Sequence, residues 1–339
     1  MKKLLFALGL LCIIGLLSAG YLYQQIFDKN VTLPQSKTLV TIPTGSTYAQ
    51  LVSKLEEEGL LMNINSFELV SKLMKYKSVK PGLYEFKDGW NNRELVSSLR
   101  SGRQKPLKLT INNFRTLPDL CGFFGSKLEA DSLSYLNYLE TMTSNNERYT
   151  KENLMSLFIP NSYEFYWNTT PKKLFERFKR EHKIFFNSTR KKKLKELGLS
   201  EEEVYTLASI VQKETLVNEE KPRVAGVYIN RLKRGQLLQA DPTVVFASGD
   251  FEIRRVLNKH LAIDSPYNTY KYEGLPPGPI CMPDVSSIDA VLNYEKHRYL
   301  YFCASTDNSG RHQFAKTLIE HNNNANKYRA YLNKQRIFK

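Results

Sequence analysis

The feature that most constrains this chain is a run of twenty residues without a charged side chain, from Leu4 to Tyr23. As an α-helix rising about 1.5 Å per residue, such a run spans about 30 Å, the thickness of the hydrocarbon core of a bilayer. A cleaved signal peptide is the alternative, but its apolar region is usually only about 7 to 15 residues long. The length therefore favours a retained transmembrane helix over residues 4–24, which would anchor the chain as a single pass.

The charges around this run predict its orientation. Lys2 and Lys3 precede it, which keeps the tail 1–3 in the cytoplasm and places the rest of the chain outside. The net charge of +15 indicates attraction to anionic surroundings such as lipid headgroups or an acidic polymer. Because the charged part faces outward, nucleic acid is excluded as a partner.

The number and spacing of the cysteines and histidines argue against a fold held together by disulfides or by a bound metal. Only Cys121, Cys281 and Cys303 lie outside the apolar run, and they show no CxxC spacing. His312 and His321 do not supply enough ligands for a metal site. We predict no metal, no cofactor and no disulfide framework, so the fold must depend on its core.

Residues 37–102 are predicted to form a self-contained module. A short strand, a turn at Pro43 to Gly45 and a helix ended by Gly59 are followed by a second helix, a strand and a helix closed by Gly102. This βααβ order with an appended helix resembles, in outline, the LysM-like module of cell-wall proteins, which implies glycan binding. A small α/β domain that binds nothing is an equal alternative, since a fold alone does not define function.

Residues 107–335 are predicted to form a second domain of mixed α/β structure, which makes the fold class α+β. Within it, Ser200 and Glu203 form a capping-box signature, so a helix should begin near Glu201. Its apolar residues recur at offsets of three and four, and Glu214 borders that apolar face. Burial beside aliphatic side chains should raise the pKa of Glu214, as a general acid requires. The alternative is a solvated glutamate paired with the adjacent lysine.

The segments after this helix combine amides, aromatic residues and prolines. A second helix covers RVAGVYINRL, with Val224, Val227 and Tyr228 facing inward, and Gln239 and Asp241 then occupy a predicted turn. A loop stiffened by prolines follows, and RYLYFCAS reads as a buried strand before a hairpin and a terminal helix. The polar and aromatic candidates of the loop are Tyr267, Asn268 and Tyr270.

Read in order, these stretches resemble the MltG (YceG-like) family of endolytic lytic transglycosylases. The resemblance rests on LASIVQKET, VYINRL, LLQADPTVV, SPYNTYKYEGLPPGPI, YLYFCAS and GRHQFAKTLIEHN, and is densest over residues 204–324. It implies a single-pass enzyme of the bacterial cytoplasmic membrane that cuts peptidoglycan glycan strands on the extracytoplasmic side. It also implies possible association with peptidoglycan synthases and termination of nascent strands.

The resemblance assigns the catalytic acid to the glutamate of the K-E-T triplet, Glu214. Many family members carry another glutamate two positions earlier, where this chain has Gln212. One carboxyl suffices for this chemistry, because the C6 hydroxyl of the substrate's own N-acetylmuramic acid attacks and gives a 1,6-anhydro end. Intramolecular attack has a high effective molarity, which reduces the need for a second protein group.

Further substrate contacts are predicted from residue type. Gln212, Gln239, Asn230 and Asn268 could hydrogen-bond the sugar, Tyr267 and Tyr270 could stack on it, and Asp241 could orient a neighbour or only cap its turn. Two rival functions stay open. One is a hydrolytic muramidase with Asp241 or Glu164 as second carboxylate, and the other is a scaffold that binds peptidoglycan without cutting it.

Overall fold

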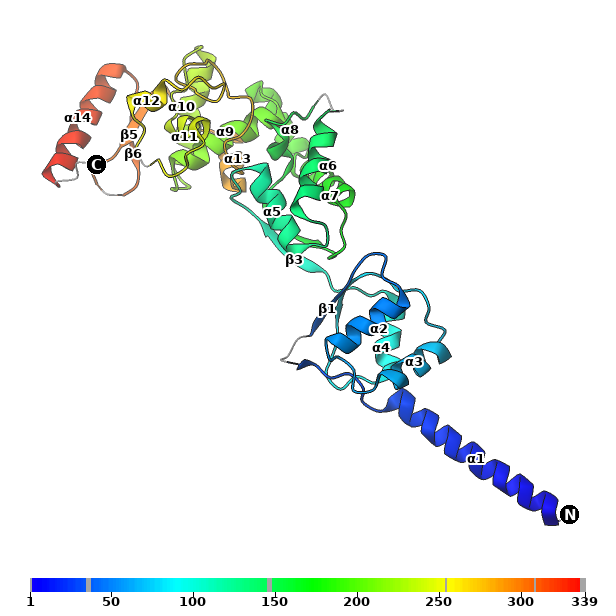
Figure 1. Cartoon of the computed structure of the whole chain (residues 1–339). Coiled ribbons are helices and arrows are strands. Elements are labelled where there is room, and N and C mark those ends of the chain that lie inside the picture. The colour runs from blue at the N-terminus through cyan, green and yellow to red at the C-terminus, as the bar shows by residue number, and fades with distance from the viewer. Residues whose placement is uncertain (1, 35–37, 145–147, 254, 308, 336–339) are drawn as a thin grey trace. The chain divides into compact units, whose positions relative to one another are not determined.

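The computed structural model describes residues 2–34, 38–144, 148–253, 255–307 and 309–335 (Figure 1). The chain divides into two compact units. The first comprises residues 1–109, 127–130 and 164–170, and the second comprises residues 110–126, 131–163 and 171–339. The mixture of helices with short antiparallel strands confirms the α+β class.

Helix α1 (Lys2–Phe27) contains the apolar run and extends beyond the predicted span on both sides. None of its residues is buried, and among the described residues it alone is long and apolar enough to cross a membrane. Its last turn is joined to the folded part of the first unit. The Asn92 side-chain amide donates to the carbonyl of Gln25 at 2.9 Å, and the Arg93 guanidinium lies 5.7 Å from the centre of the Phe27 ring. The helix is therefore compatible with a single-pass anchor.

The first unit has the predicted order of elements. Strand β1 pairs antiparallel with β2, and both pack with three helices around a core that includes Phe67, Tyr84 and Leu95. Capping boxes at Thr47 and Asn91 begin two of the helices. The elements are β1 (Leu39–Ile42), α2 (Tyr48–Glu57), α3 (Ile64–Leu73), β2 (Gly82–Glu85) and α4 (Asn92–Ser101). Residue 37, the predicted boundary, lies outside the described residues. The likeness to LysM stays a prediction.

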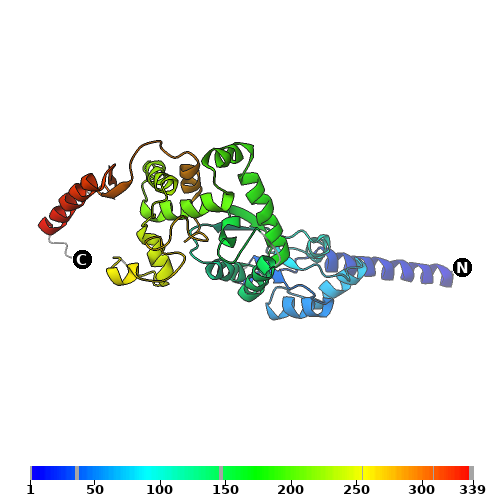
Figure 2. The ribbon, with the colours of Figure 1, turned by 90° about the horizontal axis from the view of Figure 1, so that it is seen from above.

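Helices dominate the rest of the chain (Figures 1 and 2). Strands β3 (Leu107–Ile111) and β4 (Asn161–Phe165) form one small sheet, and β5 (Tyr301–Ala304) and β6 (His312–Ala315) form another. The helices are α5 (Leu117–Lys127), α6 (Ser132–Ser144), η2 (Leu154–Leu157), α7 (Pro171–Phe185), α8 (Ser188–Leu197), α9 (Glu201–Glu214), α10 (Lys221–Lys233), α11 (Asp241–Ser248), α12 (Asn258–Leu261), α13 (Val285–Leu292) and α14 (Leu318–Lys334).

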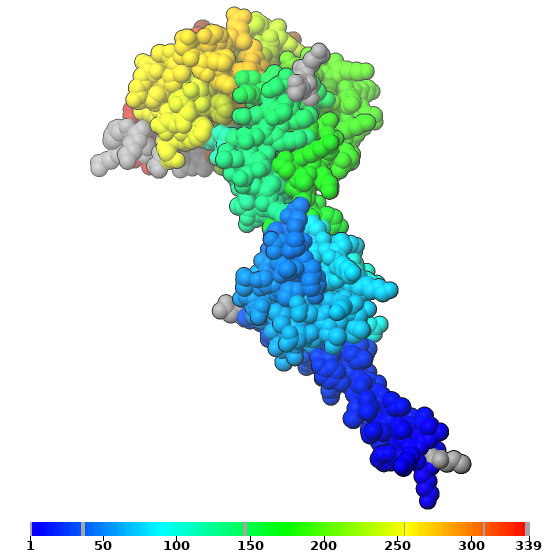
Figure 3. Space-filling model, turned by 45° about the vertical axis from the view of Figure 1, so that its right-hand side comes forward, coloured from blue at the N-terminus to red at the C-terminus, as the bar shows by residue number. Residues whose placement is uncertain are grey.

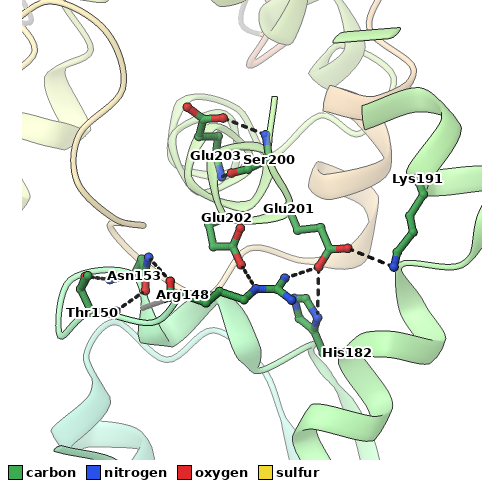
Figure 4. A network of polar contacts seen from close by, with 9 residues as sticks. All are labelled: Arg148, Thr150, Asn153, His182, Lys191, Ser200, Glu201, Glu202 and Glu203. Atoms are coloured by element: carbon green, nitrogen blue, oxygen red, sulfur yellow. Dashed lines mark hydrogen bonds and ion pairs between the residues drawn. The ribbon is translucent and has the colours of Figure 1, made fainter. Parts of the chain in front are cut away.

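Helix α9 is the centre of the second unit. It begins at Glu201 after a complete capping box between Ser200 and Glu203, as predicted, and its residues 204–211 are all buried. Its first turn is held by Arg148, which contacts Glu202 at 2.6 Å and also pairs with Glu201 (Figure 4). Helices α10, α11 and α13 pack against α9. The helix is thus fixed at its amino end and along its length, which positions its last residue.

Two local predictions were wrong. Asp241 does not lie in a turn but is the first residue of α11, because Pro242 fits the opening turn of a helix and Gly249 ends it in a left-handed conformation. The strand in RYLYFCAS is only half-buried, since β5 pairs with β6 alone and is covered by α14 on one face. The predicted hairpin and terminal helix are confirmed, and they lie together in Figure 2 (orange to red).

Candidate active site

Glu214 is the last residue of α9, where the chain leaves the helix through Thr215. Its side chain is partly buried, and the buried Tyr228 of α10 donates a hydrogen bond to Glu214 Oε1 at 2.6 Å. Among the described residues, none is hydrogen-bonded to Oε2. One carboxyl oxygen is therefore held by the protein, and the other is available to a ligand.

The environment of Glu214 favours the protonated carboxyl. Loss of solvation raises the pKa of Glu214 to about 7, the hydrogen bond from Tyr228 opposes this rise, and the negative charge of Asp241 adds to it. Arg231 lowers the pKa by a smaller amount. The carboxyl-terminal end of a helix also disfavours negative charge. The rise expected from the sequence is present, so Glu214 can exchange a proton near neutral pH.

Asp241 is the second carboxylate in this region. It projects from the start of α11 and accepts a hydrogen bond from the hydroxyl of Tyr270 at 2.5 Å. Glu214 and Asp241 are thus each bonded to a tyrosine hydroxyl. The raised pKa of Glu214 suits this carboxyl to proton exchange near neutral pH.

Two clefts meet at these carboxyls. The larger has a volume of about 550 Å³ and the smaller about 290 Å³, and both are lined by Glu214 and Asp241. The larger is completed by basic and apolar side chains, among them Arg115, Lys213, Phe246, Phe251 and Arg255. The smaller is completed by aromatic and polar ones, among them Tyr228, Gln239, Tyr270, Tyr301 and His321. An extended ligand that occupies both clefts would pass the Glu214 carboxyl.

The structure brings only some of the predicted contact residues to this site. Gln239, whose backbone φ is 46°, and Tyr270 line the smaller cleft. Tyr267 instead packs its ring on Phe246 with 4.7 Å between centroids, and lines a neighbouring pocket that does not include Glu214. Gln239, Tyr270 and Asp241 are therefore placed where they can touch a ligand beside the acid.

The other three predicted residues are hydrogen-bonded within the protein. Gln212 accepts from Lys221 Nζ at 3.2 Å and from the Ser287 hydroxyl, which connects α9 to α10 and α13. The Asn230 amide donates to the carbonyls of His297 and Tyr299, and the buried Asn268 donates to those of Leu261 and Ile263. None of these three lines either cleft at Glu214.

Sequence reasoning missed residues that complete the site. Tyr228 was expected only to face the core, yet its hydroxyl contacts the acid. Arg231, three residues further along α10, donates to the carbonyls of Leu300 and Leu238 at 2.7 Å each and lines the smaller cleft. Polar groups three apart on an otherwise buried helix face were the available signal.

Two adjoining clefts that share a carboxyl with a raised pKa, on a helix-rich α+β scaffold, define a class of protein able to transfer a proton to a bound ligand. The sequence pattern of the YceG-like family matches residues 40–327. The chain therefore belongs to the YceG-like family.

Individual relatives agree with this membership. A Bacillus subtilis (strain 168) protein named endolytic murein transglycosylase is 29% identical over 324 residues, which cover 89% of each chain. A Streptococcus pneumoniae (strain R6) protein of the same name is 27% identical and covers 94% of this chain, while this chain spans 64% of its length. The crystal structure of a Listeria monocytogenes protein described as YceG-like superposes with a TM-score of 0.55 at 28% identity, covering 84% of this chain and 97% of that one.

Proposed function

We propose that this chain is an endolytic lytic transglycosylase that cleaves the β-1,4 bond between N-acetylmuramic acid and N-acetylglucosamine inside peptidoglycan strands. The observation that carries the proposal is the Glu214 carboxyl, which has a pKa of about 7 and opens on two adjoining clefts. The printed names of the relatives from Bacillus subtilis and Streptococcus pneumoniae support the same activity.

In the proposed reaction Glu214 acts first as acid and then as base. Because Oε1 accepts from Tyr228, Oε2 carries the proton to the bridging oxygen. The bond from that oxygen to C1 of N-acetylmuramic acid breaks as the C6 hydroxyl oxygen of the same ring bonds to C1. The resulting Glu214 carboxylate then takes the hydroxyl proton, so the products are a 1,6-anhydro end and a free C4 hydroxyl, without consumption of water.

The surroundings of Glu214 fit both halves of this cycle. Burial keeps the acid protonated at the start, and the Tyr228 hydroxyl stabilises the carboxylate that forms after proton donation. The substrate supplies the nucleophile at high effective molarity. Gln239 and Tyr270 line the smaller cleft, where an amide and an aromatic ring can contact a sugar.

The setting of the activity belongs to the same proposal. With α1 in the cytoplasmic membrane, the two units would act on the extracytoplasmic side, where cutting of growing strands would end their elongation near peptidoglycan synthases. The first unit would add glycan contacts if its resemblance to LysM extends to binding.

Analysis of the products tests the proposal. Glycan strands digested with the full chain should carry anhydro ends, each lighter by one water than a hydrolysed end in mass spectrometry. Glu214→Gln should slow the formation of these ends by about 10²- to 10⁴-fold while binding to strands persists. Reducing ends throughout would overturn the mechanism, and strands cut equally by Glu214→Gln would overturn the assignment of the acid.

A muramidase is the second candidate, and it is favoured by one observation. Asp241 lines both clefts with Glu214 and is the carboxylate that a hydrolytic mechanism would need. Glu164, the other carboxylate considered, is not among the residues that line them. The same mass measurement separates the two functions, because hydrolysis leaves reducing ends.

A further inference from the structure

The larger cleft is rich in positive charge. Arg115, Lys213 and Arg255 line it, and among the described residues its acidic lining consists of Glu214 and Asp241. Burial raises the pKa of Glu214 to about 7, so a substantial fraction of this carboxyl is neutral near neutral pH. Among the described residues, none forms an ion pair with any of the three cations. The cleft therefore presents cationic groups that a ligand can neutralise.

These cations have defined positions on the cleft wall. The guanidinium of Arg115 lies 4.2 Å from the centre of the Phe251 ring, and Phe251 lines the same cleft. Lys213 directly precedes Glu214 on α9. Burial raises the pKa of the Cys281 thiol to about 11, and the charges of Lys213 and Arg115 both oppose that rise. Both cations therefore lie near the Cys281 thiol, and Cys281 directly follows Ile280, which lines the cleft.

The lining comes from segments far apart in sequence. Arg115 precedes α5, Lys213 lies in the last turn of α9, and Arg255 follows α11. In Figure 3 the segment that contains α11 and α12 (yellow) lies beside the segment that contains α5 and α6 (green), both within the second unit. Convergence of three basic residues from three segments makes this a surface created by the fold.

The smaller cleft differs in its chemistry. Its one arginine, Arg231, already donates to the carbonyls of Leu300 and Leu238. Its remaining lining is mostly aromatic and neutral polar, with Tyr270, Tyr301 and Gln239. Such groups suit uncharged sugar rings. The larger cleft suits an anion attached close to the reacting bond.

Peptidoglycan carries such an anion. Its sugar rings are neutral, and its negative charge comes from the carboxylates of the peptide stems. A stem is joined through a lactyl group to C3 of the N-acetylmuramic acid ring whose C1 reacts, so it must lie beside the general acid. We propose that the larger cleft binds the stem of the reacting N-acetylmuramic acid, and that Arg115, Lys213 and Arg255 pair with its carboxylates. The proposal rests on the proposed function and adds a substrate requirement to it.

The test uses two soluble substrates of the same strand length. One consists of uncrosslinked strands that carry stems, and the other of the same strands after an amidase has removed the stems. Neither carries a lipid pyrophosphate. The amidase leaves one lactyl carboxylate on each N-acetylmuramic acid, so the comparison isolates the carboxylates within the stem. The rate of anhydro-end formation by the full chain in detergent gives kcat/KM for each. We expect the unaltered protein to prefer the stem-bearing strands by about tenfold or more, the value of a charge-assisted contact.

Charge removal in the cleft should erase this preference. In Arg115→Gln combined with Arg255→Gln, the ratio of the two kcat/KM values should fall toward one, and added salt should lower the ratio of the unaltered protein. The alkaline limb of the pH profile should not move, because neither arginine is among the causes of the Glu214 pKa shift. Lys192→Gln combined with Lys195→Gln, on exposed positions of α8, removes the same charge elsewhere and should leave the ratio unchanged.

Each outcome has a distinct meaning. Equal rates of the unaltered protein on both substrates would overturn stem recognition and leave the transglycosylase proposal intact. An equal loss on both substrates in the double arginine variant would also overturn it, since the cations would then serve the glycan backbone. If neither substrate gave anhydro ends, the proposed function itself would be overturned.

Discussion

Helix α9 carries glutamates at both ends, and the protein treats the two ends in opposite ways. At the amino end, Glu201 and Glu202 pair with Arg148, in a turn where the helix dipole also favours negative charge (Figure 4). At the carboxyl end, Glu214 has a tyrosine hydroxyl as its hydrogen-bond partner. The same residue type thus forms ion pairs at one end and, in the proposed reaction, carries a proton at the other.

The residue type is the same at both ends of α9, so the difference between these glutamates comes from their solvation and from their hydrogen-bond or ion-pair partners. The carboxylates of the first turn stay paired with cations, whereas Glu214 loses water without gaining an adjacent cation. A buried carboxyl without a cation holds its proton to higher pH. Each experiment below either removes the difference between the two ends or measures it.

The largest effect is expected from Glu214→Gln. Loss of the general acid should reduce the rate of anhydro-end formation by about 10²- to 10⁴-fold. Glu203→Gln is the matched control at the other end of α9, because glutamine can also complete the capping box with Ser200. Equal rates in the two variants would contradict the contrast.

A second effect concerns stability. The native pKa of Glu214 is about 7, above the usual value of about 4.3, so the native state binds this proton more tightly than the unfolded state. The stabilisation from this proton is complete at pH values below the pKa of the unfolded state, and it is lost as pH rises through the pKa of the native state. Relative to Glu214→Gln, the free energy of unfolding should therefore fall by about 2 to 3 kcal/mol between pH ~4 and ~7.

Urea titrations at several pH values provide this measurement. The difference between the two proteins must be used, since the buried His182 has a pKa lowered to about 4 by its loss of solvation and contributes the opposite slope. A difference that does not change with pH would show that Glu214 is solvated like an ordinary glutamate.

Tyr228→Phe should shift the pH profile of the reaction upward. The hydroxyl stabilises the ionised carboxylate, so its removal raises the pKa of Glu214 further and extends the protonated acid to higher pH. The alkaline limb of kcat/KM is the quantity to follow. The rate at its plateau should also fall, because the carboxylate formed after proton donation loses its donor.

Asp241→Asn should shift the same limb in the opposite direction. The negative charge of Asp241 raises the pKa of Glu214, so neutralising it lets Glu214 ionise at lower pH. Opposite displacements in these two variants would identify Glu214 as the titrating group. If the alkaline limb moved in the same direction in both variants, it would report the titration of another residue.

The smallest effect is expected at the amino end. Arg148→Gln removes one partner of Glu201 and of Glu202, but the arginine is 47% exposed and Glu201 keeps its contacts with Lys191 and His182, so the free energy of unfolding should fall by only about 1 kcal/mol. Thermal unfolding measures this loss. The alkaline limb should stay in place, because Arg148 is at the other end of the helix from the acid.

Local signals made part of this site predictable. The capping box and the apolar spacing are confined to α9, so they predicted both its start and the position of Glu214 at the border of its buried face. The bonds of Glu214 to Tyr228 and of Asp241 to Tyr270 join residues 14 and 29 positions apart. Such pairs depend on how helices pack, which periodicity does not determine.

The amide side chains predicted to contact the sugar show a second limit of prediction from sequence. Asn230 and Asn268 have the side chains expected of a sugar-binding site, yet they bond to backbone carbonyls of neighbouring segments. An amide offers the same donors to a carbonyl and to a sugar. Residue type therefore could not separate the two uses, and only the surrounding backbone could.

The junction after α1 has a consequence for reach. Asn30 and Val31 donate backbone hydrogen bonds to Trp90, and Asn92 holds Gln25, so the apolar helix passes into the first unit without slack. If α1 spans a bilayer as proposed, this short connection would hold the first unit close to the lipid surface. The proposed glycan contacts of that unit would then be limited to strands that lie beside the membrane.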